Sequence, residues 1–591
     1  MTVKKQLISE LKKVLTGLDF PDFGPSVDYP QDAKHGDYST NIALIAAKKL
    51  GKNPMEVGED FKIKLSNIDF VEKIDVVRPG FINFWIKNEF LAEKLQNEIE
   101  IPNVGEGKKV VVEYTDPIPF NEFHIGHLYS NVVGESITRL LEATGVIVWR
   151  ADYFGDVGMH VAKSLWGLLK KFADDKITID DLSKKSLPER IAYFGQAYAL
   201  GATTYEEDES AKEEMKELNF LCFKAAQEIV LSTFNEKPQI DYDRFIKKGK
   251  YEYKDIKNLY KVGREWSLAY FETIYARLGT KFDGYYPESR TGEFGYGMVM
   301  DGLEKGIFVK GDGGAIIFPG SKHGLHDRVF INSLGLPTYE TKDFGNAVAK
   351  QKDFAYDQSI IVTGNEINEY FHVIIKALGL LVPELGEKTI HVGHGMVRLP
   401  EGKMSSRTGK IKTGESLLDA AKIQAKQLSE SEDEALADQI GQAAVKYAFL
   451  KSSIGKDIIF DFEESVSFDG NSGPYLQYTF ARTQSVLLKA EISNFQFPIS
   501  NFKLQIEERE LLRLLSRFPE VIEEAAKRLS PNILCNYLFE LAQAFNLFYQ
   551  KCPILKAEEE TKAFRLTLTK STGETVKKGL NLLGIKAPEK M

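Results

Sequence analysis

A strand–helix–strand pattern near residue 110 constrains the fold more than any other feature of the chain. The β-branched run KKVVVEYTDP is typical of a buried strand, and a helix from about Gly126 to Thr144 and a second strand, VIVWRADYFGD, come after it. A unit of this length predicts parallel strands joined by a right-handed crossover. Further strand-like stretches follow at GGAIIF, DRVFIN, SIIVTG and TIHVGH. We therefore expect an α/β fold with a doubly wound, Rossmann-like parallel sheet.

Segments on both sides of this pattern divide the 591 residues into further regions. The first hundred residues combine an amphipathic helix over 1–20, a helix over 41–50 and two strands around the turn RPG, which predicts an α+β domain. After the glycine-rich DGNSGP the chain is helical nearly to its end, which predicts an all-α bundle. The predicted regions are 1–104, 105–400 with a mainly helical insertion at about 160–280, 401–470, and 471–591.

Composition excludes several classes of protein. With 43% hydrophobic residues the chain is not largely disordered, and it lacks the run of about 18 apolar residues that a membrane span needs. Three cysteines cannot form a disulfide framework or a four-cysteine zinc site, so we expect a reducing cytoplasm and no protein metal site. The net charge of −9 argues against a generally basic nucleic-acid-binding protein. Residues 501–591 carry a small excess of Lys and Arg, which fits either a local polyanion site or ordinary surface scatter.

The segment EFHIGHLYSNVVG lies between the first predicted strand and the following helix, where an anion commonly binds. His124 and His127 bracket Gly126 there. Imidazole N–H groups can donate to phosphate oxygens, and a glycine lets a base or ribose approach the backbone. The alternative is a pair of surface histidines beside a turn.

A second segment, MVRLPEGKMSSRTGKIKTG, reads as a flexible loop with cations and hydroxyls between glycines. Lys403, Ser405, Ser406 and Arg407 suit a pyrophosphate that is bound in a transition state and then released. The alternative is a solvated basic loop.

The two segments together are far more specific than either alone. His-Ile-Gly-His followed by Lys-Met-Ser-Ser-Arg resembles the paired signatures of class I aminoacyl-tRNA synthetases. KKVVVEYTDP, YETKDF at 339–344 and GNSGPYLQYTFAR resemble the arginyl-tRNA synthetase family in particular. HGDYSTNIALIAAKKLGKNP and RPGFINFWI resemble its N-terminal tRNA-contacting domain, and YLFELAQAFNLFYQKCPIL its helical anticodon-binding domain. The resemblance covers essentially the whole chain.

The resemblance implies an arginine–tRNA ligase. It would activate L-arginine with ATP to arginyl-adenylate and pyrophosphate, then transfer arginine to the terminal ribose 2′-hydroxyl of tRNA(Arg). Mg²⁺ would accompany ATP through its phosphates. Regions 1–104, 105–400, 401–470 and 471–591 would be the tRNA-contacting domain, the catalytic domain, the signature loop with a stem-contact region, and the anticodon-binding domain. The family also implies a monomer. The implied catalytic residues are His124, His127 and Lys403, and the implied ATP-binding residues are His124, Gly126, His127, Gly364, Glu366, Lys403, Met404 and Ser405.

For arginine itself, the resemblance implies contacts from Glu113, Tyr339 and Asp343. A guanidinium group favours planar, anionic, bidentate partners. A spacing of four places Tyr339 and Asp343 on one face of a helix. The alternative for Glu113 and Asp343 is a structural ion pair.

Three residues depart from the family pattern. Ile118 stands where asparagine is usual, Asn121 where lysine is common, and Ile367 where glutamine is usual. Isoleucine cannot hydrogen-bond, so we expect a raised KM for arginine. The departures motivate an alternative function, a synthetase-like tRNA-binding protein with weak or no charging activity. A third possibility, a nucleotidyltransferase that acts without tRNA, does not explain the two terminal regions.

Aromatic residues near the C-terminus are candidates for stacking on anticodon bases. Their helical spacing with Leu538 and Leu541 favours a different interpretation, the core of the helical bundle. These aromatic residues are Tyr537, Phe545, Phe548 and Tyr549.

Overall fold

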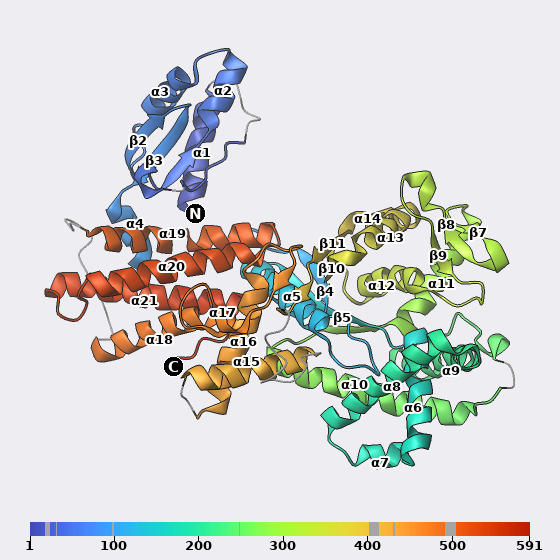
Figure 1. The fold of residues 1–591 in the computed structure, drawn as a ribbon. Helices are drawn as coiled ribbons and strands as arrows, with labels where there is room; N and C mark the ends of the chain where they lie inside the picture. The colour runs from blue at the N-terminus through green and yellow to red at the C-terminus, as the bar shows by residue number, and fades with distance from the viewer. Residues whose placement is uncertain are drawn as a thin grey trace. The chain divides into compact units, whose positions relative to one another are not determined.

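The computed structural model describes residues 1–17, 24–30, 32–96, 100–246, 249–400, 413–429, 432–490 and 504–591. Contacts divide the chain into two compact units (Figure 1). One unit comprises Met1–Val104, Ala143–Gly145 and Phe468–Met591, and the other comprises Gly105–Glu142 and Val146–Ser467. No helix among these described stretches is long and apolar enough to cross a membrane.

The second unit is built on a five-stranded parallel sheet, which confirms the predicted α/β fold. Strands β4 and β5 pair in parallel from Lys109 opposite Ile147 to Glu113 opposite Ala151, with α5 (Ile125–Ala143) between them in the chain. The chain runs outward from β4 through β5 to β6 and later returns to β10 on the other side of β4. Ligands of doubly wound sheets bind at such a reversal. In the order β11-β10-β4-β5-β6, the strands span Thr389–His394, Gln358–Gly364, Lys109–Tyr114, Ile147–Phe154 and Gly284–Pro287.

One face of this sheet packs on a hydrophobic core beneath three helices. Val111 and Ala151 of the sheet share that core with Phe344 and Ala347 of α12. Because side chains alternate along a strand, Glu113 lies on the same face as Val111. The predicted strands GGAIIF and DRVFIN form a separate antiparallel sheet, β7-β8-β9. These elements are α11 (Glu288–Glu304), α12 (Tyr339–Asp353), α13 (Asn368–Leu381), β7 (Val309–Lys310), β8 (Ile316–Phe318) and β9 (Arg328–Ile331).

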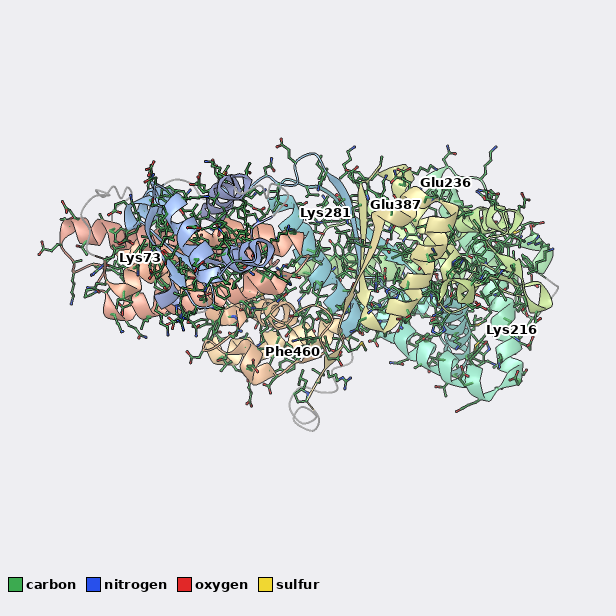
Figure 2. All side chains as sticks on the ribbon, turned by 90° about the horizontal axis from the view of Figure 1, so that it is seen from above. Lys73, Lys216, Glu236, Lys281, Glu387 and Phe460 are labelled. Atoms are coloured by element: carbon green, nitrogen blue, oxygen red, sulfur yellow. The ribbon has the colours of Figure 1, made fainter. Side chains whose placement is uncertain are left out.

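A series of helices lies between β5 and β6 and forms an insertion in the second unit. Lys216 of α9 lies at its periphery (Figure 2). The insertion comprises α6 (Met159–Asp175), α7 (Ile179–Ser183), α8 (Leu187–Glu207), α9 (Glu209–Phe234) and α10 (Tyr253–Leu278). After β11 come α15 (Gly414–Ser429), α16 (Glu434–Leu450) and α17 (Phe462–Val466).

The first unit joins the N-terminal α+β module to the C-terminal helices. Leu7, Leu11, Val14 and Leu15 of α1 are buried, which confirms the predicted amphipathic helix. Strands β1, β3 and β2 form an antiparallel sheet in that order. The elements are α1 (Val3–Thr16), β1 (Tyr38–Thr40), α2 (Ile42–Leu50), α3 (Pro54–Lys64), β2 (Val71–Val77), β3 (Phe81–Ile86), α4 (Asn88–Gln96), α18 (Gly473–Ala490), α19 (Ile506–Lys527), α20 (Pro531–Lys551) and α21 (Glu559–Leu582).

A buried carboxylate of α19 links the two ends of the chain. Glu520 accepts hydrogen bonds from the Lys4 backbone N–H at 2.7 Å, the Tyr29 hydroxyl at 2.6 Å and the Tyr38 hydroxyl at 3.1 Å. These contacts span hundreds of residues in the sequence, so no local pattern could reveal them.

The aromatic residues of α20 mostly belong to the core of the helical bundle. Tyr537, Phe545 and Phe548 are buried, which confirms the interpretation as core, whereas Tyr549 is 43% exposed and contradicts it.

Candidate active site

His124 and His127 form a reciprocal pair at the N-terminus of α5. The backbone N–H of His124 donates to Nδ1 of His127 at 3.3 Å, and the backbone N–H of His127 donates to Nδ1 of His124 at 3.4 Å. The two rings stack with centroids 3.3 Å apart. Because each Nδ1 accepts a hydrogen bond, the neutral rings carry their protons on Nε2, where they can donate to an anion.

The electrostatics favour the neutral form of both rings. Burial lowers the pKa of His124, and burial together with the neighbouring His124 lowers the pKa of His127 well below its usual value. The pair is therefore uncharged at neutral pH. At neutral pH the two rings can therefore donate hydrogen bonds to phosphate without a change in their own protonation.

Gly126 lies directly against the first histidine. A Cβ atom built at this position would lie 3.1 Å from both Cε1 and Nδ1 of His124. A side chain would therefore force the imidazole ring to shift by a few tenths of an ångström, which would disturb the reciprocal pair.

Lys403, Met404 and Ser405 lie outside the described residues, as do Ser406 and Arg407. The described chain resumes at Thr413, which forms a β-bridge with His124. The next residue, Gly414, donates its N–H to the Phe123 carbonyl at 2.7 Å. The end of that segment is thus held beside the histidine pair.

Gly364 and Glu366 follow the carboxyl end of β10, the strand next to β4. The exposed Glu366 carboxylate folds over Gly364 so closely that a Cβ there would collide with it. Both residues therefore lie at the same edge of the sheet as the chain that leads from β4 to His124.

Tyr339 and Asp343 lie on successive turns of α12, as their spacing predicts. The Tyr339 side chain is 54% exposed, and its hydroxyl lies 3.2 Å from Nδ1 of His160. Asp343 accepts a hydrogen bond from the Tyr370 hydroxyl at 2.5 Å and forms no ion pair with a described residue. Burial raises the pKa of Asp343 to about 7, and the Glu113 carboxylate adds to the increase against the opposing hydrogen bond from Tyr370.

Glu113 has partners of its own on α12. It accepts hydrogen bonds from Nζ of Lys350 at 2.5 Å and Nδ2 of Asn346 at 2.8 Å, and its ion pair with Lys350 is almost fully buried. Two turns nearer the N-terminus, Lys342 forms a second buried ion pair with Glu288 at 2.5 Å. The contacts of Glu113 are those of a structural ion pair, and its contact with a substrate stays a prediction.

These lysines were not among the predicted site residues, although the sequence carries a signal for them. Lys342, Asn346 and Lys350 recur every four residues and are all buried. Polar residues at this spacing on a helix that covers a sheet indicate buried partners on that sheet.

The residues that depart from the family pattern are also on this side of the unit. Ile118 is half-buried in the loop after β4, and Ile367 is 36% exposed at the start of α13. Asn121 uses its Oδ1 to accept a hydrogen bond from the Glu122 N–H at 2.8 Å. No group of three His, Cys, Asp or Glu residues within the described ranges could hold a metal ion.

Comparison with known proteins identifies the family. Residues 1–86 match the arginyl tRNA synthetase N-terminal domain, 89–462 the catalytic domain of class I (R) tRNA synthetases, and 476–591 the DALR anticodon binding domain. The chain belongs to the arginyl-tRNA synthetase family. It is 32% identical to an arginine–tRNA ligase of Flavobacterium psychrophilum, with 96% of each chain covered. It is 30% identical to one of Treponema denticola, with 96% of this chain and 95% of that one covered.

Solved structures share the fold over the full length of the chain. The Thermus thermophilus arginyl-tRNA synthetase matches with a TM-score of 0.80 at 24% identity, and all of both chains is covered. The Plasmodium falciparum arginyl-tRNA synthetase matches with a TM-score of 0.76 at 21% identity, also over all of both chains.

Replacing Gly126 by alanine tests how far catalysis by this synthetase depends on the geometry of the histidine pair, because the substitution should not destabilise the fold. Alanine favours a helix by up to about 1 kcal/mol over glycine, so the variant should fold at least as well. Its Cβ would shift the His124 ring, so we expect kcat/KM for ATP to fall by up to about 10²-fold, the loss that is typical when one transition-state donor is removed. Steady-state kinetics with varied ATP measures the loss. Unchanged kinetics in a stable variant would show that the position of His124 does not matter.

The pKa of Asp343 predicts how arginine binding depends on pH. Because that pKa is about 7, the group is protonated below neutral pH, and a bound guanidinium group must first displace its proton. The KM for arginine should therefore rise up to about tenfold per pH unit below 7 and be constant above it. The KM for ATP serves as the control, since burial lowers the pKa of both histidines and so favours their neutral form. An arginine KM that is constant from pH 6 to 8 would contradict the prediction.

Proposed function

We propose that this chain is an active arginine–tRNA ligase. The arginine carboxylate attacks the α-phosphate of ATP, the bond to pyrophosphate breaks, and arginyl-adenylate forms. The 2′-hydroxyl of the terminal tRNA ribose then attacks the carbonyl carbon, and AMP leaves. No covalent enzyme intermediate is required, because positioning and electrostatics supply the rate.

The observation that carries this proposal is the set of groups at the β4–β10 edge. The neutral histidine pair offers two Nε2 donors for ATP phosphates, and Asp343 offers a carboxylate without an ion-pair partner among the described residues. A donor set for phosphate and a carboxylate for a cation, both in the second unit, fit the two substrates of the first step. In this proposal Lys403 and Ser405 stabilise the departing pyrophosphate, and Mg²⁺ is bound through the ATP phosphates.

The other regions take their roles from the family. We propose that residues 1–104 contact tRNA, that 401–470 include the signature loop and contact the acceptor stem, and that 471–591 bind the anticodon. If Lys and Arg of the C-terminal helices contact phosphates, the tRNA affinity falls steeply with salt.

Pyrophosphate exchange into ATP tests the first step. The purified chain is incubated with ATP, Mg²⁺, labelled pyrophosphate and arginine, with and without tRNA(Arg). We expect exchange that requires arginine and Mg²⁺, with tRNA(Arg) present because members of the family typically need it. No exchange under any condition, with tRNA(Arg) still retained on a filter, would favour the alternative, a synthetase-like tRNA-binding protein. Ile118, Asn121 and Ile367 would then be the first residues to revert.

A further inference from the structure

The turn that leaves β4 is strained at three non-glycine residues. Thr115 has φ 93°, Asp116 has φ 50° and Phe120 has φ 66°, all in the region that side chains avoid. A β-branched residue such as Thr115 is especially unfavourable there. Backbone strain of this kind persists only when the surrounding structure enforces it, and it gathers where a side chain must be positioned for function.

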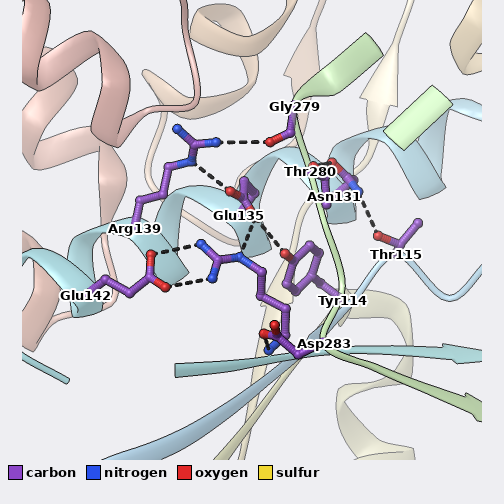
Figure 3. A network of polar contacts seen from close by, with 10 residues as sticks. Tyr114, Thr115, Asn131, Glu135, Arg139, Glu142, Gly279, Thr280 and Asp283 are labelled. Carbon is purple, nitrogen blue, oxygen red and sulfur yellow. Dashed lines mark hydrogen bonds and ion pairs between the residues drawn. The ribbon is translucent and has the colours of Figure 1, made fainter. Parts of the chain in front are cut away.

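Contacts from α5 hold this turn in place. The Thr115 N–H donates to Oγ of Ser130 at 3.0 Å, and Asn131 donates to Oγ1 of Thr115 at 3.0 Å. Thr280 in turn donates to Oδ1 of Asn131 at 2.8 Å. Figure 3 shows Thr115, Asn131 and Thr280 beside a second set of contacts, in which Glu135 accepts from the Tyr114 hydroxyl at 2.7 Å. The residues before and at the start of the turn are thus fixed by side chains.

The turn carries a carboxylate, Asp116, that forms no ion pair with a described residue. Oδ1 of Asp116 is buried and has no hydrogen-bond partner among the described residues. Burial, Glu113 and Asp343 all raise the pKa of Asp116, so these carboxylates lie near one another. A buried acceptor without a donor is costly, and a cationic ligand would supply one.

The charges of the pocket can be matched to the substrate. Lys350 pairs with Glu113 and Lys342 pairs with Glu288, whereas Asp116 and Asp343 form no ion pair with a described residue. Arginine carries two cationic groups, a guanidinium and an α-ammonium. A third buried carboxylate without an ion pair among the described residues, Asp152, follows Ala151 on β5 and so lies on the sheet face opposite Glu113, where it accepts from the Tyr275 hydroxyl at 2.9 Å. Asp116 and Asp343 are the carboxylates that remain for the two cations.

The position of Asp116 in the chain indicates which cation it takes. The α-ammonium lies one bond from the carbon that carries the carboxylate, and that carboxylate must reach the phosphate beside His124. Asp116 lies on the segment from β4 to His124, whereas Asp343 lies on α12 with Tyr339. Ile118, on the same segment, offers no hydrogen bond.

We propose that Asp116 binds the α-ammonium group of the arginine substrate, leaving the guanidinium group to Asp343. This inference rests on the proposed function, since it assumes that arginine occupies the pocket. Asp116 supplies the contact that Ile118 cannot make, so its carboxylate binds the α-ammonium group of the substrate through an ion pair.

Two arginine analogues test the assignment by binding alone. Agmatine keeps the amine and the guanidinium but lacks the carboxylate, and 5-guanidinopentanoate keeps the guanidinium and the carboxylate but lacks the amine. Calorimetry on the full chain compares both with arginine, for the unsubstituted chain and Asp116→Asn. Asparagine tolerates positive φ, and Asp116→Gly, which relieves the strain, is the second variant if the first folds poorly. Asp357→Asn is the matched control, because Asp357 accepts from the Lys109 N–H at the opposite end of β4.

We expect Asp116→Asn to lower the affinity for arginine and agmatine about 10- to 100-fold, which is the usual effect of losing a charged hydrogen bond. The affinity for 5-guanidinopentanoate should fall less than about twofold. Adding Ile118→Asn to Asp116→Asn should recover part of the arginine affinity. An equal loss of affinity for all three ligands, or no loss for any of them, would overturn the role of Asp116. Arginine binding by the unsubstituted chain would in that case still support the proposed function. An unsubstituted chain that charges no tRNA and binds none of the three would overturn the proposed function itself.

Discussion

Replacing Asp343 by asparagine is expected to lower kcat/KM for arginine by about 10³- to 10⁴-fold. A site built to bind a charged, hydrogen-bonding group loses this much when the pair is broken, because buried polar groups are left without partners. The asparagine side chain has nearly the same shape as aspartate, and it can still accept from the Tyr370 hydroxyl, which lies 2.5 Å from Oδ2 of Asp343. The loss therefore reports the charge rather than the packing. Steady-state charging with varied arginine measures it.

Citrulline, the neutral isostere of arginine, makes the test specific. The unsubstituted chain should strongly prefer arginine, whereas Asp343→Asn should distinguish the two only weakly. The KM for ATP should stay within about twofold, because the histidine pair is untouched. The Asp343→Asn variant should also show a smaller rise of the arginine KM below pH 7, with Asp116, whose pKa burial also raises, left as the remaining source. A variant that keeps both its arginine preference and its pH dependence would exclude Asp343 from the guanidinium site.

Replacing Lys350 by methionine is expected to destabilise the second unit by about 3–5 kcal/mol. The Lys350–Glu113 pair is buried on both sides at 2.5 Å, and removal of one partner leaves an uncompensated buried charge. Adding Glu113→Gln removes that charge and should restore most of the stability. Three of the four tryptophans, Trp149, Trp166 and Trp266, lie in this unit, so tryptophan fluorescence during urea unfolding follows it.

The double variant also decides between the two interpretations of Glu113. If Glu113 is only the partner of Lys350, the stable Lys350→Met/Glu113→Gln chain should bind arginine with an unchanged KM. If Glu113 also contacts the guanidinium group, that KM should rise about tenfold or more. A Lys350→Met variant as stable as the parent chain would contradict the account of the buried pair.

Local patterns predicted most of the strands, but not how the strands pair. KVVVEY, SIIVTG and TIHVGH became β4, β10 and β11 of one sheet, while the similar stretches in GGAIIF and DRVFIN became strands of another. An apolar run shows that a strand is buried but not which neighbour it pairs with. β6, Gly284–Pro287, escaped prediction because four residues ending in proline resemble a turn.

The candidate site was likewise only partly predictable from the sequence. His124, Gly126 and His127 are adjacent in the sequence, so their motif was visible, although the reciprocal hydrogen bonds were not. Lys350 meets Glu113 across 237 residues of sequence, and only the fold brings them together. The positive φ of Asp116 is likewise a property of the folded turn.

Charging of tRNA(Arg) with arginine is the decisive assay of ligase activity. The purified chain is incubated with ATP, Mg²⁺, tRNA(Arg) and either labelled arginine or labelled lysine, and the label in precipitated tRNA is counted. We expect that arginine is esterified to tRNA, that lysine is not, and that omission of ATP abolishes the product. No arginyl-tRNA from a chain that binds tRNA(Arg), or equal charging with lysine, would contradict this expectation.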